Sequence, residues 1–297
     1  MVIKKTRGEK IFTVFNYLLM GILACISLFP ILNILSVSFS SKAAASAGLV
    51  GIWPVEFTTK AYEFVAGNKI FFSTFLVSLK RVAIGVPINM MVIIPAAYAL
   101  SVTSPGFRFR SVFSWFFIIS MLFSGGLIPM LLTVQAVGII DSIWALVLPL
   151  AAPIFYIIIM MNFFKAIPSE LSEAAAIDGA THWGILLKVF VPISRPAIAT
   201  ILLLCFILHW NSWFDGLLYI NRPSDYPLQS YLQTIIAPST DLSQMSKNPE
   251  QYKIFELVSE RTVKSAQIFL ATIPIMLIYP YIQKNFTKGH ILGAVKG

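Results

Sequence analysis

Long apolar stretches separated by polar connections dominate this chain of 297 residues. A helix needs about 20 predominantly apolar residues to cross the hydrocarbon core of a membrane, because lipid offers its backbone no hydrogen-bonding partner. Six stretches are long enough, at residues 11–39, 72–101, 111–134, 142–164, 197–220 and 266–283. The pattern predicts an all-α membrane protein with six transmembrane helices in one domain, residues 11–284, between end tails of residues 1–10 and 285–297.

The composition agrees with a membrane protein. Hydrophobic residues make up 57% of the chain and charged residues 12%, and the mean hydropathy is +0.81, so too little polar surface remains for two soluble domains. These values also exclude disorder, a collagen-like rod and a nucleic-acid-binding domain, despite a net charge of +9. Cys25 and Cys205 each lie in an apolar run, and two isolated thiols predict neither a metal site nor a disulfide framework.

The start of the chain has some features of a secretory signal peptide. Basic residues precede the first apolar stretch, and residues 43–47 offer small side chains for cleavage. The apolar run over 11–39 is nevertheless far longer than the roughly 7 to 15 residues of a signal peptide's apolar region. We therefore expect a retained first helix.

The distribution of basic residues predicts the orientation, because Lys and Arg accumulate in the cytoplasmic connections of membrane proteins. They occur at both ends of the chain and in the second and fourth connections, as Lys4, Lys5, Arg7, Lys10, Arg108, Arg110, Lys165, Lys188, Arg195, Lys284, Lys288 and Lys296. The short third connection, residues 135–141, contains neither Lys nor Arg. We expect both termini in the cytoplasm.

Two basic residues, Lys80 and Arg81, fall inside the second apolar stretch. If the span begins near Val82, about 20 residues remain to Ser101, and both long side chains can extend to the outer interface. We expect this arrangement. The alternative is a buried functional charge.

The fourth connection, residues 165–196, predicts two short helices. Ser169 is the expected N-cap of the first helix, and Gly179 can take the left-handed conformation that ends it. A second helix over 181–191 is expected to continue until Pro192 redirects the chain.

One face of the first short helix carries Leu171, Ala174 and Ala175. Their small side chains would let a groove of another protein approach the backbone closely. The alternative is a pair of surface helices that only covers the end of the bundle.

The spacing in this connection resembles the signature loop of binding-protein-dependent ABC importer permeases. That signature is Glu-Ala-Ala, three residues, Gly, nine residues, then aliphatic, any residue, aliphatic, Pro. It matches here at Glu173, Ala174, Ala175, Gly179, Val189, Val191 and Pro192. In that family the loop between helices 4 and 5 is a coupling helix that docks on a cytoplasmic ATPase subunit, so the resemblance implies this role for these residues.

The C-terminal Gly-Ala-Val-Lys-Gly resembles the second permease subunit of maltose-type carbohydrate importers, and residues 210–215 and 226–229 resemble a branch linked with complex oligosaccharides, including uronic-acid-containing ones. The resemblance implies a bacterial cytoplasmic (inner) membrane protein. It also implies a sister permease subunit, two ATP-binding subunits, an extracytoplasmic solute-binding protein and an oligosaccharide substrate. The tail from Lys288 to Gly297 resembles tails that reach the ATPase interface; a flexible basic end near anionic lipid is the alternative.

No Gly-x-x-x-x-Gly-Lys-[Ser/Thr] phosphate-binding loop occurs in the sequence. The chain is therefore not expected to be the ATPase itself, and we expect no catalytic residues and no cofactor in it. By the resemblance, ATP and Mg are bound by the partner ATPase subunits.

The predicted fifth helix carries a polar and aromatic cluster made of His209, Trp210, Asn211, Trp213 and Asp215. Such groups are costly within a membrane unless they face protein or water, and planar rings with amides or carboxylates suit a sugar pathway. An aromatic belt at the membrane interface is the alternative. An acidic sugar would be repelled by Asp215 unless a cation offset its charge.

The external connection over 221–264 is too long for a simple link. It carries balanced charges, which suit a wet protein interface. By the resemblance it should meet the binding protein, through residues such as Arg222, Asp241, Lys247, Lys253 and Glu256. A solvated loop without a partner is the alternative.

Two other classes of function are less compatible with the sequence. An enzyme would need a catalytic arrangement, but His209 and Asp215 are six residues apart and face different sides of a helix. An ion-coupled secondary transporter or channel is the stronger alternative. Such proteins usually show mid-membrane carboxylates or an internal repeat, and the six stretches show neither.

Overall fold

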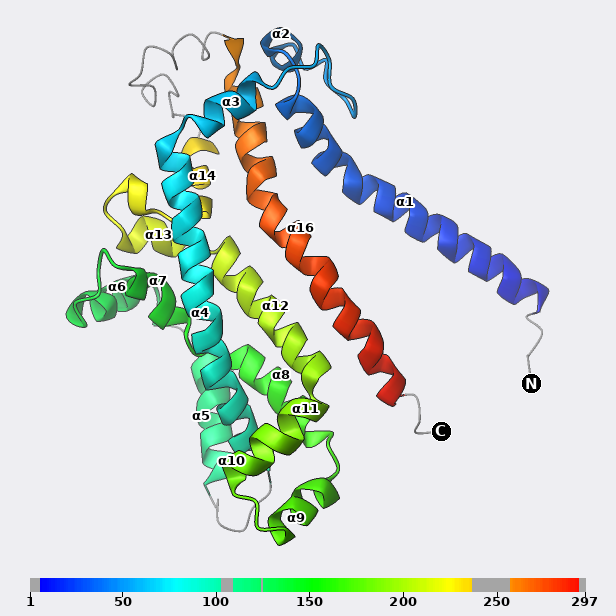
Figure 1. The fold of residues 1–297 in the computed structure, drawn as a ribbon, viewed down its shortest axis with the longest axis vertical. Coiled ribbons are helices and arrows are strands. Elements are labelled where there is room, and N and C mark those ends of the chain that lie inside the picture. Colours follow the sequence, from blue (N-terminus) through cyan, green and yellow to red (C-terminus); the bar gives the residue numbers. More distant parts are fainter. Residues whose placement is uncertain (1–5, 103–108, 124, 237–256, 294–297) are drawn as a thin grey trace. The chain divides into compact units, whose positions relative to one another are not determined.

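The computed structural model describes residues 6–102, 109–123, 125–236 and 257–293, with side chains as far as residue 280, and every regular element in these ranges is a helix (Figure 1). In chain order the elements are α1 (Arg7–Ser38), α2 (Lys42–Ser46), α3 (Lys60–Ala66), α4 (Lys69–Ser101), α5 (Arg110–Leu122), α6 (Leu127–Ala136), α7 (Ile143–Val147), η1 (Leu148–Leu150), α8 (Ile154–Lys165), α9 (Ser169–Ile177), α10 (His182–Ile185), η2 (Leu186–Phe190), α11 (Val191–Ile193), α12 (Arg195–Asn211), α13 (Phe214–Tyr219), η3 (Pro223–Asp225), α14 (Leu228–Ile236) and α16 (Glu260–Gly293). The all-α prediction is confirmed for the described residues.

Three helices are each long and apolar enough to cross a membrane: α1, α4 and the part of α16 from Glu260 to Pro280. Three further candidates are pairs of helices that pass the same test only together, namely α5 with α6, α7–η1 with α8, and α10–α11 with α12. By length and composition, the described helices therefore offer between three and six spans. The count of six stays a prediction.

Three of the predicted helices are interrupted, and a proline or a glycine lies at two of the breaks. The chain bends by 45° between η1 and α8, where Pro153 is the N-cap of α8. Gly126, with φ of +86°, precedes α6. The predicted helix over 197–220 ends at Asn211, and a separate helix follows from Phe214. Hydropathy reports apolar content, not continuity of the helix, so the apolar pattern did not reveal these breaks.

The chain divides into two compact units, and the first comprises Met1–Lys69 with Thr234–Thr272. Its α1 starts with a capping box in which Thr6 and Glu9 exchange hydrogen bonds. None of the most apolar window of α1 is buried within this chain. That surface is suited to contact with lipid or with another membrane subunit.

The segment after α1 folds back on the end of that helix. The Asn33 amide donates hydrogen bonds to the carbonyl groups of Val50 (3.0 Å) and Gly51 (2.8 Å), and Arg261 donates to the Ala45 carbonyl at 3.0 Å. A small core of Val37, Ala44, Ala45 and Val50 lies beneath. This part of the unit is therefore an ordered cap and not a loose connection.

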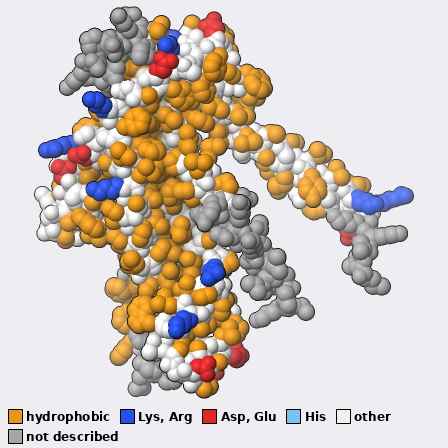
Figure 2. Space-filling view, in the orientation of Figure 1, with side chains coloured by type: hydrophobic (Ala, Val, Ile, Leu, Met, Phe, Trp, Pro, Cys, Tyr) orange, Lys and Arg blue, Asp and Glu red, His pale blue; other side chains and the backbone are white. Residues whose placement is uncertain are grey.

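The second unit comprises Ile70–Gln233 with Ile273–Gly297 and contains almost all of α4. Figure 1 places α9 and α10 near the C-terminal end of α4 and α13 beside its N-terminal half. Figure 2 shows hydrophobic side chains over most of the face in view, with charged side chains in small separate groups. Against this apolar surface, the buried polar side chains of α4 identify the candidate site.

Candidate functional site

One face of α4 carries a stripe of polar and small residues, Ser78, Arg81, Gly85 and Asn89, which we call the α4 polar stripe. The residues are three or four positions apart, so they project from the same side of the helix. All four are buried, and Arg81 and Asn89 are fully inaccessible to solvent. A polar group in a membrane helix is stable when protein partners surround it, so each residue should have a partner.

Arg81 forms a buried ion pair with Asp215. One guanidinium nitrogen, Nη1, lies 3.2 Å from Asp215 Oδ1, and Nη2 contacts Oδ2, which gives a two-point pair. The Arg81 side chain is 0% exposed and the Asp215 side chain 18%. The expectation that Arg81 extends to the outer interface is therefore wrong, because the Asp215 carboxylate compensates its charge inside the protein. Lys80, its neighbour, is exposed.

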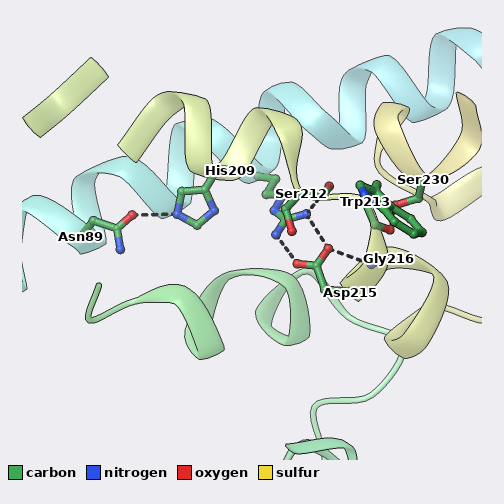
Figure 3. Close-up of polar contacts among 8 residues, drawn as sticks. Asn89, His209, Ser212, Trp213, Asp215, Gly216 and Ser230 are labelled. Carbon is green, nitrogen blue, oxygen red and sulfur yellow. Dashed lines mark hydrogen bonds and ion pairs between the residues drawn. The ribbon is translucent and has the colours of Figure 1, made fainter. Parts of the chain in front are cut away.

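The ion pair lies at the break between α12 and α13. The Ser212 carbonyl, which no longer belongs to a helix, accepts a hydrogen bond from Arg81 Nη1 at 3.3 Å. The next carbonyl, that of Trp213, accepts one from the Ser230 hydroxyl at 2.6 Å (Figure 3). Side chains from α4 and α14 thus bond two of the carbonyl groups at the break, where lipid offers no partner.

Asn89 connects two further parts of this unit. Its Oδ1 accepts a hydrogen bond of 2.7 Å from His209 Nε2 on α12 (Figure 3). Its amide nitrogen donates to the carbonyl groups of Leu150 (2.6 Å) and Ala151 (3.0 Å), at the bend before α8. All the hydrogen-bonding capacity of the Asn89 amide group except one acceptor position is therefore used for holding α4, α12 and this bend together.

Gly85 lets α12 approach α4 closely. A Cβ atom at this position would overlap the imidazole ring of His209. At the other end of the stripe, the Ser78 hydroxyl accepts a hydrogen bond of 2.7 Å from the Leu228 amide at the start of α14. The α4 polar stripe therefore contacts α12, the α12–α13 break and α14.

The structure separates the predicted pathway residues into two groups. His209 and Trp210 are buried against protein: Trp210 stacks on Phe206 at 5.8 Å between ring centroids and meets the edge of Phe75. Neither side chain is open to solvent in this chain, and a place for them in the pathway or in an interfacial aromatic belt stays a prediction. Their side chains pack toward α4, because small or polar residues there make room for them.

Asn211 and Trp213, by contrast, have exposed side chains in this chain taken alone, and Asp215 is partly exposed. The helix predicted over 197–220 is not continuous here, because α12 ends at Asn211 and α13 begins at Phe214. All three residues lie at or next to this break.

Sequence reasoning missed Ser78, Gly85 and Asn89. Each is unremarkable alone, because Ser, Gly and Asn occur in many membrane helices. The available signal was their spacing with Arg81, which places four non-aliphatic residues on one face of an otherwise apolar helix.

The predicted coupling segment forms two short helices. Helix α9 begins at Ser169 with Pro168 as its cap, so Ser169 is the first helical residue and not the N-cap. Gly179 has φ of +79°, as expected of a residue that ends a helix, and the Ala180 amide donates to the Ala175 carbonyl at 2.9 Å. The following stretch runs through α10, a π-helical turn (η2) and α11 up to Ile193.

Aromatic side chains attach this segment to the membrane helices. Phe190 is buried and meets the edges of Tyr98 on α4 (5.0 Å between centroids) and Phe164 on α8 (5.4 Å). The Tyr98 hydroxyl and His182 Nδ1 are 3.4 Å apart and share a hydrogen bond. A movement of the segment would therefore be transmitted to α4 and α8.

Helix α9 itself has no buried residue. Of the residues matched to the signature, Glu173, Ala174, Gly179 and Pro192 are exposed, whereas Ala175 and Val189 are partly buried. Two apolar side chains of α9 are also exposed to solvent: Leu171 is 44% exposed and Ile177 is 86% exposed. The surface of α9 is available to another protein.

Some predicted residues lie outside the described part of the chain. These are Asp241, Lys247, Lys253 and Glu256, expected to contact the binding protein, and the basic residues Lys4, Lys5, Arg108 and Lys296. Arg222 is described and is exposed, next to η3. Within the described residues, no three His, Cys, Asp or Glu side chains are grouped so that they could hold a metal ion.

Comparisons with known proteins identify relatives over nearly the whole chain. The family model described as "Binding-protein-dependent transport system inner membrane component" matches residues 89–290. The polygalacturonan/rhamnogalacturonan transport system permease protein YtcP of Bacillus subtilis (strain 168) is 37% identical over 288 residues, which cover 96% of this chain and 97% of YtcP. Protein LplC of the same organism is 36% identical and covers 98% of this chain and 97% of its own length.

A solved structure agrees with these relatives. A chain in the crystal structure of a bacterial ABC transporter involved in the import of the acidic polysaccharide alginate matches with a TM-score of 0.84 and 35% identity. The match covers 95% of this chain and 99% of that chain. The resemblance inferred from the signature loop is thereby confirmed: the chain belongs to the family of inner membrane components of binding-protein-dependent transport systems, as a permease subunit of an ABC transporter.

Proposed function

We propose that this chain is one of two permease subunits in an ATP-driven importer for an acidic oligosaccharide. The substrate class is supported by the relatives, since one transports polygalacturonan or rhamnogalacturonan and a similar structure belongs to an alginate importer. A sister permease, two ATP-binding subunits that hold ATP and Mg, and an extracytoplasmic binding protein complete the assembly. Six spans with both termini in the cytoplasm are part of the same proposal.

The exposed surface of α9 and the attachment of the following segment to the membrane helices support the coupling role. Its surface is open, small residues occur at Ala174 and Ala175, and the segment that follows is fixed to α4 and α8 through Phe190. A segment fixed in this way can act as a lever: it converts movement of an attached subunit into movement of the membrane helices. Docking of α9 on an ATPase subunit is the role that fits it.

The substrate pathway is proposed to pass the exposed side chains at the α12–α13 break, Asn211, Trp213 and Asp215. An amide and a carboxylate can bind sugar hydroxyl groups, and an indole ring can stack on a sugar face. Arg222, with Asp241, Lys247, Lys253 and Glu256, is proposed to face the binding protein. Balanced charge in this connection supports that assignment.

Uptake by the reconstituted assembly in proteoliposomes tests the proposal, with labelled trigalacturonate as the sugar. We expect uptake that needs ATP and the binding protein and continues without an ion gradient. Uptake driven by an ion gradient without ATP would instead support an ion-coupled transporter or channel.

A bulky residue at Ala175 tests the coupling role. Ala175→Trp should lower sugar uptake by about tenfold or more, within the usual range of coupling between sites, while the membrane helices stay folded. ATP hydrolysis should persist without stimulation by the loaded binding protein. Trp183→Ala, at an exposed position of the next helix outside the matched signature, is the control. Normal uptake by Ala175→Trp would contradict the coupling role.

A further inference from the structure

We propose that Arg81 is a specificity-determining residue for acidic cargo: by pairing with Asp215 it makes the α12–α13 break electrically neutral, so that a negatively charged sugar can pass Asn211 and Trp213. The inference rests on the proposed function. It assigns to α4 a role in substrate selection, in addition to its structural contacts.

The geometry supports a pair that cancels its own charge locally. The guanidinium group meets both carboxylate oxygens of Asp215 and is inaccessible to solvent, whereas 18% of the Asp215 side chain remains exposed. The exposed member of the pair is thus the acid, and the compensating cation lies behind it. Lys80, although adjacent in sequence, is exposed on another face of α4 and does not contact Asp215.

Without Arg81, Asp215 would present a full negative charge beside the exposed side chains of the break. The interior of a membrane protein screens charge weakly. At an effective dielectric constant of about 20, two like charges roughly 7 Å apart lower binding by about 10- to 100-fold. An uncompensated Asp215 would therefore discriminate against uronic acid residues at this point of the pathway.

A purely structural role for the pair is the main alternative, because Arg81 also donates to the Ser212 carbonyl. The two explanations predict different changes in the preference between acidic and neutral sugars. If the pair only supports the break, loss of either charge should affect acidic and neutral sugars equally. If it controls local charge, loss of Arg81 and loss of Asp215 should shift the preference in opposite directions.

The test is a competition between trigalacturonate and its fully methyl-esterified, neutral form for ATP-driven uptake into proteoliposomes. The complete assembly is used, so selection by the binding protein is the same for every variant. Arg81→Met should lower the acid-to-ester uptake ratio by about tenfold, and Asp215→Asn should raise it. Arg81→Met/Asp215→Asn should restore the wild-type ratio within about twofold, because the site is neutral again. Lys80→Met, the adjacent exposed control, should leave the ratio unchanged.

Copurification with the ATPase subunits shows which variants assemble. If Arg81→Met fails to assemble, Asp215→Asn and the double variant still test the inference, because one changes the local charge and the other does not. An equal acid-to-ester ratio in all assembled variants would overturn the inference and leave the proposed function intact. A wild-type complex that imports neither sugar with ATP would overturn both.

Discussion

Hydrogen bonds to protein stabilise a buried polar residue in a membrane helix, and the α4 polar stripe makes several of them, although the buried Arg81 Nε has no partner among the described residues. Arg81 is paired with Asp215, and Asn89 uses its amide for two carbonyl groups of a helix bend and for His209. Removing one partner of such a contact leaves the others unsatisfied, which costs more than the net value of the bond. These residues are therefore expected to be sensitive to substitution, out of proportion to their size.

Asn89 provides the residue-scale prediction. Asn89→Leu keeps a similar volume but leaves His209 and the Leu150 and Ala151 carbonyl groups without their partner. We expect a loss of about 2–4 kcal/mol in the free energy of unfolding. Denaturant titration of the purified chain in detergent measures it. Met91→Leu, at a 73% exposed position two residues on, should change stability by less than about 0.5 kcal/mol. Equal stability of the two variants would contradict this explanation of Asn89.

At the scale of elements, the structure consists of three uninterrupted candidate spans and three bent pairs. A further break separates α12 from α13, and the exposed Asn211 and Trp213 side chains lie on either side of it. Asp215 follows in the first turn of α13 and pairs with Arg81 on α4.

Hydropathy was sufficient to predict the helical class and the positions of the apolar segments, since burying an apolar run in lipid depends on local composition alone. The breaks depend on tertiary partners. Arg81 donates a hydrogen bond to the Ser212 carbonyl and Ser230 donates one to the Trp213 carbonyl, and neither contact is visible in the local sequence. The same limit applies to Trp210: its burial against Phe75 and Phe206 depends on how α4 and α12 pack. Gly179 was predictable, because a left-handed helix end is a local requirement.

Gly179 provides the element-scale prediction. Gly179 has a φ of +79°, a left-handed conformation that costs a residue with a Cβ atom about 1–2 kcal/mol whatever the space around it. Gly179→Ala should therefore loosen the end of α9. We expect faster proteolysis within 165–181 and lower ATP-driven uptake. Gly184→Ala is the matched control: its Cβ would meet only ordinary contacts at 3.6–3.7 Å, and no left-handed conformation is involved. Equal proteolysis rates for the two variants would show that the end of α9 does not depend on this glycine.

At the scale of the whole molecule, α4 connects the two functional regions of its unit. Arg81, toward one end of α4, holds the α12–α13 break, and Tyr98, toward the other end, contacts the segment that follows α9. The two residues are 17 positions apart, which corresponds to about 25 Å along a helix. One helix therefore joins the proposed coupling surface to the proposed pathway. The proposed function requires such a connection, since ATP hydrolysis and substrate entry are proposed to occur on different sides of the membrane.

The proposed coupling role places α9 against an ATPase subunit in the cytoplasm, and cross-linking from the surface of α9 examines this contact. Cys25 is replaced by Ser and a cysteine is introduced at the exposed position Ala174, so that the buried Cys205 is the other thiol of the chain. The assembled transporter is treated with a short reagent that reacts with a thiol at one end and with an amine at the other. We expect a cross-link between Ala174→Cys and an ATP-binding subunit, and protection of Ala174→Cys from membrane-impermeant maleimide added outside intact cells. A cysteine that labels from outside, or that cross-links to no ATP-binding subunit in an active complex, would contradict the proposed coupling role.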